Sequence, residues 1–69
     1  MAFKTVVLRY PPGERLPVIL KEKITDTLLD AIDVVNCYDD HIFADIYEND
    51  LLVLMMRTEL GAGRNWYTV

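Results

Sequence analysis

The run from Leu51 to Met56 constrains the fold most strongly, because all of its residues are apolar. A membrane-spanning helix needs about 20 such residues, so this run is far too short to cross a bilayer. It is typical of a strand that is buried on both faces of a sheet. Side chains alternate along a strand, which gives two apolar sets: Leu51, Val53 and Met55, and then Leu52, Leu54 and Met56. The sequence therefore predicts a sheet that needs cover on both faces.

A single segment, residues 25–36, has the spacing of a helix. Thr25 is a good N-cap, Asp26 follows in the first turn, where a carboxylate meets the positive end of the helix dipole, and Asn36 ends the segment. Apolar residues at helical spacing form the predicted buried stripe: Leu28, Leu29, Ile32 and Val35. We expect this helix to cover one face of the sheet.

The other segments are rich in β-branched and aromatic residues or alternate in polarity, which predicts strands over residues 3–10, 16–22, 41–48, 51–58 and 64–69. Residues 11–15 form a turn, since two prolines precede a glycine. A helix over residues 17–23, started by Pro17, is the alternative for the second strand. The prediction is an α+β fold: a single domain, residues 1–69, with an antiparallel sheet of four to five strands and one helix packed on one face, in the order ββαβββ.

One helix leaves the second face of this sheet uncovered. Phe43 and Tyr47 alternate with the apolar set Ile42, Ala44 and Ile46, so the second face carries an apolar patch too large for a free monomer. A chain of 69 residues buries only about 60% of its unfolded surface. Its single cysteine excludes an internal disulfide. We therefore expect a homodimer or a larger complex.

The charge is concentrated in the middle of the chain. Eight of the eleven carboxylates lie between residues 26 and 50, and no Lys or Arg occurs from residue 24 to residue 56. These carboxylates are Asp26, Asp30, Asp33, Asp39, Asp40, Asp45, Glu48 and Asp50. The first three have helical spacing, which places them on one helix face, opposite the apolar stripe. Such a row either keeps the protein soluble or docks on a basic surface.

The residues that would support catalysis or cofactor binding are sparse. The chain has no serine, and Cys37, which has acids nearby, is predicted to be a small buried hydrophobe. His41 and Asp45 would lie about 13 Å apart along a strand, too far to share a metal ion. Residues 61–66 are rich in glycine but lack the Lys and Ser/Thr of a phosphate-binding loop, so they predict a hairpin turn. We expect no enzyme activity, cofactor or metal.

Three functions are compatible with these patterns. The first is a non-enzymatic inhibitor or regulator whose acidic segment, residues 26–50, mimics nucleic acid and occupies a basic, nucleic-acid-binding surface of a protein partner, with Phe43, Tyr47 or Trp66 as the apolar anchor. In compactness and acidity the chain is similar to small phage-encoded inhibitors, including anti-CRISPR proteins and inhibitors of host polymerase, a resemblance of general character that implies a viral protein. The alternative is an assembly module that uses its apolar sheet face. The third is a small metal-dependent hydrolase with an oligomeric site.

The location and partners follow from the same composition. Residues 1–10 lack a basic stretch followed by a long apolar one, so we expect no signal peptide and a cytoplasmic protein. The basic residues form no run, which disfavours direct binding of nucleic acid. We also expect no membrane partner.

Overall fold

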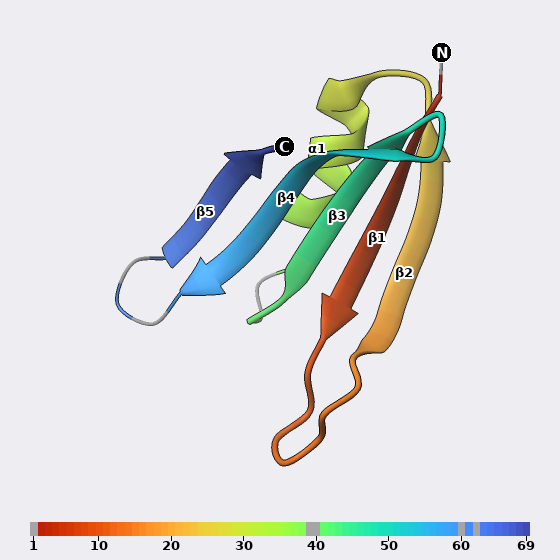
Figure 1. The fold of residues 1–69 in the computed structure, drawn as a ribbon. Helices are drawn as coiled ribbons and strands as arrows, with labels where there is room; N and C mark the ends of the chain where they lie inside the picture. Colours follow the sequence, from red (N-terminus) through yellow and green to blue (C-terminus); the bar gives the residue numbers. More distant parts are fainter. Residues whose placement is uncertain (1, 39–40, 60, 62) are drawn as a thin grey trace.

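The computed structural model describes residues 2–38, 41–59, 61 and 63–69. They form a five-stranded antiparallel sheet with one helix, in the order ββαβββ, which confirms the predicted α+β fold. The elements are β1 (Phe3–Arg9), β2 (Val18–Thr25), α1 (Leu28–Asn36), β3 (Phe43–Glu48), β4 (Leu51–Glu59) and β5 (Gly63–Thr68). Across the sheet the strands follow the order β2-β1-β3-β4-β5, so β2 and β5 are the edges (Figure 1).

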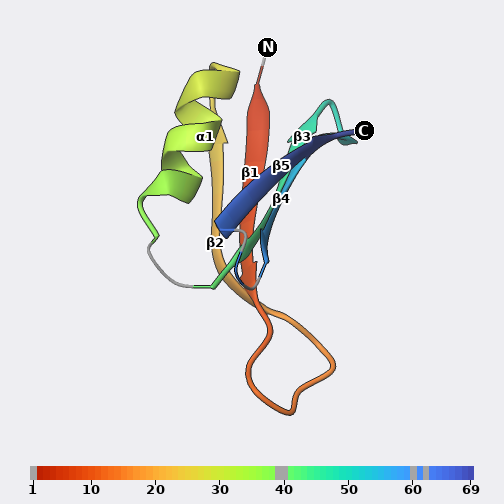
Figure 2. The same cartoon turned by 90° about the vertical axis from the view of Figure 1, so that its left-hand side faces the viewer.

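The helix and the sheet form two layers. Helix α1 lies on one side of the sheet and packs on β1 and β2 (Figure 2). The loop between β1 and β2 extends beyond the end of the sheet, away from the helix. We call the sheet face away from α1 the open face; alternation along the paired strands places Val6, Tyr47 and Met55 on it.

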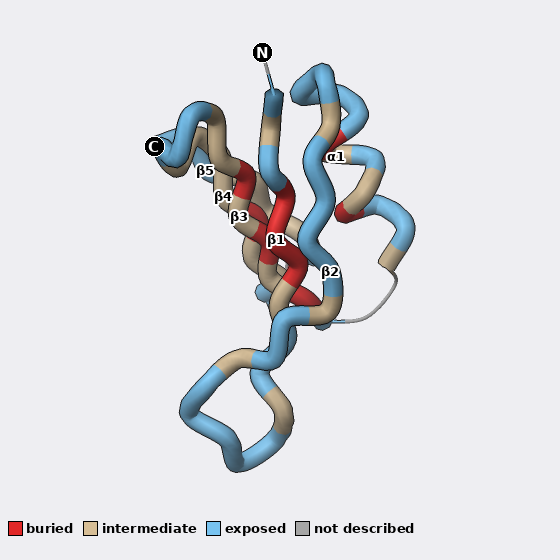
Figure 3. Tube along the Cα trace, turned by 90° about the vertical axis from the view of Figure 1, so that its right-hand side faces the viewer, coloured by how far each residue is buried: buried red, intermediate tan, exposed pale blue. Residues whose placement is uncertain are grey.

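The core lies between α1 and the sheet. Val7 of β1 is opposite Ala44 of β3, and Ala44 is opposite Met56 of β4, so these side chains share the face that the helix covers. All three are fully buried, together with Val35 of the helix and Ile42, which precedes β3. Figure 3 shows the buried residues along β1, β3 and the inner side of α1. The central strands and the helix therefore supply the core, and the edge strands supply little of it.

The helix begins two residues later than the sequence predicted. Its N-cap is Thr27, whose Oγ1 accepts a hydrogen bond from the backbone N–H of Asp30 at 3.1 Å. Thr25 instead ends β2, opposite Phe3, and its hydroxyl donates to the carbonyl of Thr27 at 3.0 Å. The predicted second strand is confirmed, although β2 covers residues 18–25 instead of 16–22, and the helical alternative over residues 17–23 is wrong.

The predicted buried stripe of the helix is partly wrong. Val35 is fully buried, but Leu28 is 38% and Leu29 is 71% exposed. Ala31 takes their place in the core, with no exposed surface. The small Ala31 side chain lets the helix approach β1 closely enough for the Thr5 hydroxyl to donate to the Ala31 carbonyl at 3.3 Å. The helix is therefore turned about its axis relative to the prediction.

The predicted strict alternation of side chains between the two faces of β4 is also wrong at one point. Ile46 is opposite Leu54, whereas the next residue, Tyr47, is opposite Leu52, so β4 contains one extra residue at Val53. A bulge of this kind shifts the alternation by one. Leu52 and Met55 consequently share the open face with Tyr47. The expected uncovered apolar face is present, with a different set of residues from β4.

Candidate functional site

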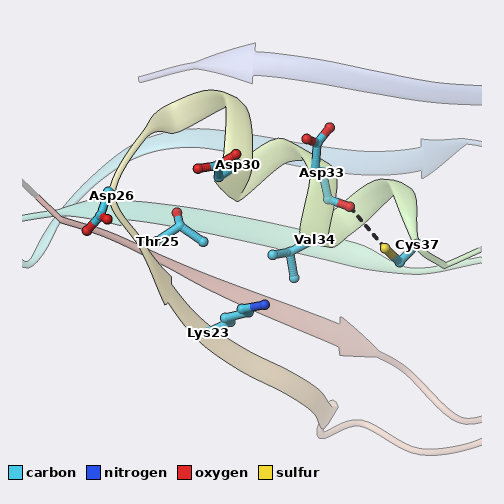
Figure 4. A pocket seen from close by; sticks show the side chains of 7 residues that line it. All are labelled: Lys23, Thr25, Asp26, Asp30, Asp33, Val34 and Cys37. Atoms are coloured by element: carbon cyan, nitrogen blue, oxygen red, sulfur yellow. Dashed lines mark hydrogen bonds between the residues drawn. The ribbon is translucent and has the colours of Figure 1, made fainter.

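An open groove of about 410 Å³ runs between the edge strand β2 and helix α1 (Figure 4). Three segments line it: the end of β2, the turn after β2, and one side of α1. We call it the acidic groove; its lining residues are Lys23, Thr25, Asp26, Asp30, Asp33, Val34 and Cys37. All three predicted helix-row carboxylates therefore line this groove, with Asp26 ahead of the helix rather than within it.

Local structure determines where these carboxylates lie. Asp30 and Asp33 are three residues apart in the helix, so they project from neighbouring positions on one side of it. The Thr27 cap fixes the start of the helix, and the hydrogen bond from Thr5 to Ala31 fixes its position over β1. Asp30 and Asp33 are thus held by the helix backbone, which reduces the ordering cost of binding a ligand.

The groove is negatively charged. Asp26, Asp30 and Asp33 are all exposed, and within the described part of the chain none of them forms an ion pair. Lys23 lines the β2 wall as the one cationic residue among the lining residues. Asp30 also lies in the first turn of α1, where the helix dipole favours a negative charge. The groove can therefore bind cationic groups, and it has an apolar floor at Val34.

The other predicted acidic residues lie elsewhere. Asp45 is on the open face, where its Oδ1 pairs with the Nη2 of Arg57 at 3.1 Å. Glu48 ends β3, and Asp50 lies in the turn to β4 with a positive φ of 64°. Asp39 and Asp40 fall outside the described residues. The described part of the acidic segment is therefore divided among the groove, the open face and the β3–β4 turn.

The three aromatic candidates do not share a surface. Phe43 and Tyr47 lie on the open face, opposite Leu8 and Lys4 of β1. Trp66 is opposite Met56, on the helix side of the sheet, where it packs partly buried against the core. Trp66 thus has a structural role in the packing of β5.

Cys37 and Arg57 also differ from what the sequence predicted for this part of the molecule. Cys37 is exposed, which corrects the prediction that it is buried; its thiol donates to the Asp33 carbonyl at 3.3 Å. The rotation of the helix that buries Ala31 also turns Cys37 towards the groove. The missed residue is Arg57, which lies 5.2 Å from the Phe43 ring centre and donates to the carbonyls of Ala44 and Met56. The sequence did contain a signal for this contact, because an arginine in one predicted strand and an aspartate in the neighbouring predicted strand can form an ion pair.

Comparisons with known proteins do not indicate a function for this chain. No family model matches the chain, and no curated protein or solved structure shows significant similarity to it. Within the described residues, no group of three His, Cys, Asp or Glu side chains is arranged to hold a metal ion. No helix in the same part of the chain has the length and apolarity that crossing a membrane requires.

Proposed function

We propose that this protein is a non-enzymatic inhibitor or regulator that binds a protein partner, and that its acidic groove docks on a basic, nucleic-acid-binding surface of that partner. The observation that carries the proposal is the gathering of Asp26, Asp30 and Asp33 along one groove without ion pairs in the described chain. Asp30 and Asp33 on one side of the helix, with Asp26 on the segment before it, present a row of negative charges that resembles the charges of a phosphate backbone. The rest of the acidic segment contributes to long-range attraction only.

The strength of this attraction depends on salt. Charges separated by more than about 8 Å are largely screened at 0.15 M ionic strength. Exposed carboxylates that face a basic surface therefore act mostly on the association rate, which falls as salt rises. The shallow groove, with Val34 on its floor, offers little apolar burial by itself, so binding here should be strongly salt-dependent.

The test compares two variants with the same charge change. One replaces Asp26, Asp30 and Asp33 by Asn; the control replaces Glu14 and Glu48 by Gln and Asp50 by Asn, all outside the groove lining. The probe is a fluorescent arginine-rich peptide of about 12 residues, titrated by anisotropy at about 50 and 300 mM salt. We expect the groove variant to bind about tenfold more weakly than the control at low salt. Equal loss in both variants would mean that net charge, not the groove, attracts the peptide.

The same pair of variants then identifies the partner. Protein captured from the native host by the parent chain should be lost with the groove variant and kept with the control variant. Short duplex DNA added to the capture should displace this chain from its partner, because both would occupy the same basic surface. A partner that the groove variant captures as well as the parent does would contradict the proposal.

A further inference from the structure

The open face is an extended apolar surface. Its accessible apolar members include Leu8, Ile24, Tyr47, Leu52 and Met55, whereas Val6 on the same face is buried. Ile24 is 68% exposed, and Ile19, on the same face of β2, is 56% exposed. In Figures 1 and 2, no helix formed by the described residues lies over this side of the sheet. Contiguous apolar surface of this kind is a feature of interaction sites.

Four of the five charged groups that the described strands place on the open face form two ion pairs. Lys4 lies 3.5 Å from Glu22 of the neighbouring strand, and Arg57 lies 3.1 Å from Asp45. Glu59 accepts a hydrogen bond from the Tyr67 hydroxyl. Among the described strand residues the two ion pairs cancel, whereas the Glu59 carboxylate, hydrogen-bonded to a neutral hydroxyl, leaves one negative charge on this face. The acidic groove differs, because its three carboxylates form no ion pair within the described chain.

The pairing of charged groups within the open face determines which kind of partner can bind there. Covering an unpaired charge is expensive, whereas a pair that keeps its hydrogen bonds loses less on burial. Arg57 is held especially firmly, since it also donates to the carbonyls of Ala44 and Met56 and stacks on Phe43. A highly charged partner gains little from a face on which only one charge is uncompensated. A second copy presents the same apolar surface, so repulsion between two open faces is confined to the uncompensated Glu59 carboxylates.

We infer that two copies of this chain form a symmetric dimer, packed open face to open face. Sheets that pack face to face lie about 10 Å apart, with their strands rotated by about 30°. A standard interface takes about 800 Å² from each partner, which is about one sixth of the 4898 Å² that the chain exposes. One of the two broad faces of a two-layer domain is large enough for this. Both acidic grooves remain on the outer sides of the dimer.

Sedimentation velocity between about 1 and 200 µM tests the inference. The parent chain should sediment at twice its 8.0 kDa mass, and the dimer should persist at about 500 mM salt, because its contacts are apolar. Ile24→Lys and Tyr47→Lys should each raise the dimer dissociation constant about 30-fold. Ile24 is exposed enough for its substitution to leave the monomer folded, as circular dichroism should verify.

Two controls separate this inference from its alternatives. Leu29→Lys makes the same charge change at a residue that is 71% exposed on the helix, and it should leave the dimer intact. The groove variant with three Asn residues should also dimerise normally, whether or not it binds basic peptide. A parent chain that stays monomeric throughout, or a dimer that Leu29→Lys weakens as much as Ile24→Lys does, would overturn the inference.

Discussion

The orientation of helix α1 gives a sharp test of the packing. Val35 has no exposed surface, whereas Leu29 is 71% exposed on the same helix. Val35→Ala removes two buried methyl groups, each worth about 0.8 kcal/mol in transfer free energy, and leaves a cavity. We expect a loss of about 2–3 kcal/mol in the free energy of unfolding. The whole stability of a chain this size is about 3–10 kcal/mol, so the loss should be obvious.

Leu29→Ala is the matched substitution on the other side of the helix. It removes more carbon atoms than Val35→Ala, but they are mostly in water, and alanine is the better helix former. Its effect should stay within about 0.5 kcal/mol. Urea unfolding followed by circular dichroism, at one fixed protein concentration, measures both variants. If Leu29→Ala lowered the free energy of unfolding as much as Val35→Ala does, Leu29 would be buried, as the sequence predicted. The orientation of α1 described above would then be wrong.

Two further predictions concern single hydrogen bonds. Thr27→Ala should destabilise the protein by about 1 kcal/mol in urea unfolding, because it removes the N-cap acceptor. Thr25→Ala should lower the free energy of unfolding less. A larger loss for Thr25→Ala would mean that Thr25 is the N-cap. The hydrogen bond to Glu59, with the carboxylate charge and partial burial, raises the pKa of Tyr67 above its ordinary 10.0. The stabilisation linked to this shift should be complete below pH 10 and should disappear as the pH rises through the folded-state pKa. Absorbance titration of the tyrosines should show one late transition that Glu59→Ala moves to lower pH; an unchanged titration would contradict the assignment.

The element order could be predicted from the sequence because its signals are local. Alternation in residues 42–47 and helical spacing in residues 28–35 each need only a few neighbouring residues to be recognised. The prolines and the glycine of residues 11–13 likewise mark the first hairpin by their backbone restrictions. The gathering of Asp26, Asp30 and Asp33 was predictable for the same reason.

The remaining features depend on contacts between distant segments. The buried side of the helix was decided by the fit of Ala31 against Thr5, which are 26 residues apart. Two threonines, Thr25 and Thr27, could each cap the helix, and the extension of β2 along β1 selected the second. The bulge at Val53 and the pairing of Arg57 with Asp45 are properties of the β3–β4 register. No pattern within a single segment contains that information.

The two lysines of β2 have a consequence for the behaviour of the protein at high concentration. Lys21 and Lys23 lie on an edge strand whose outer backbone groups have no neighbouring strand in the sheet order. A second β2 strand added in antiparallel register would bring these ammonium groups close to those of its neighbour, and charged edge residues of this kind oppose fibre growth. Chemical acetylation of the lysines removes that repulsion. A purified, acetylated sample should therefore form β-rich aggregates that the unmodified protein resists.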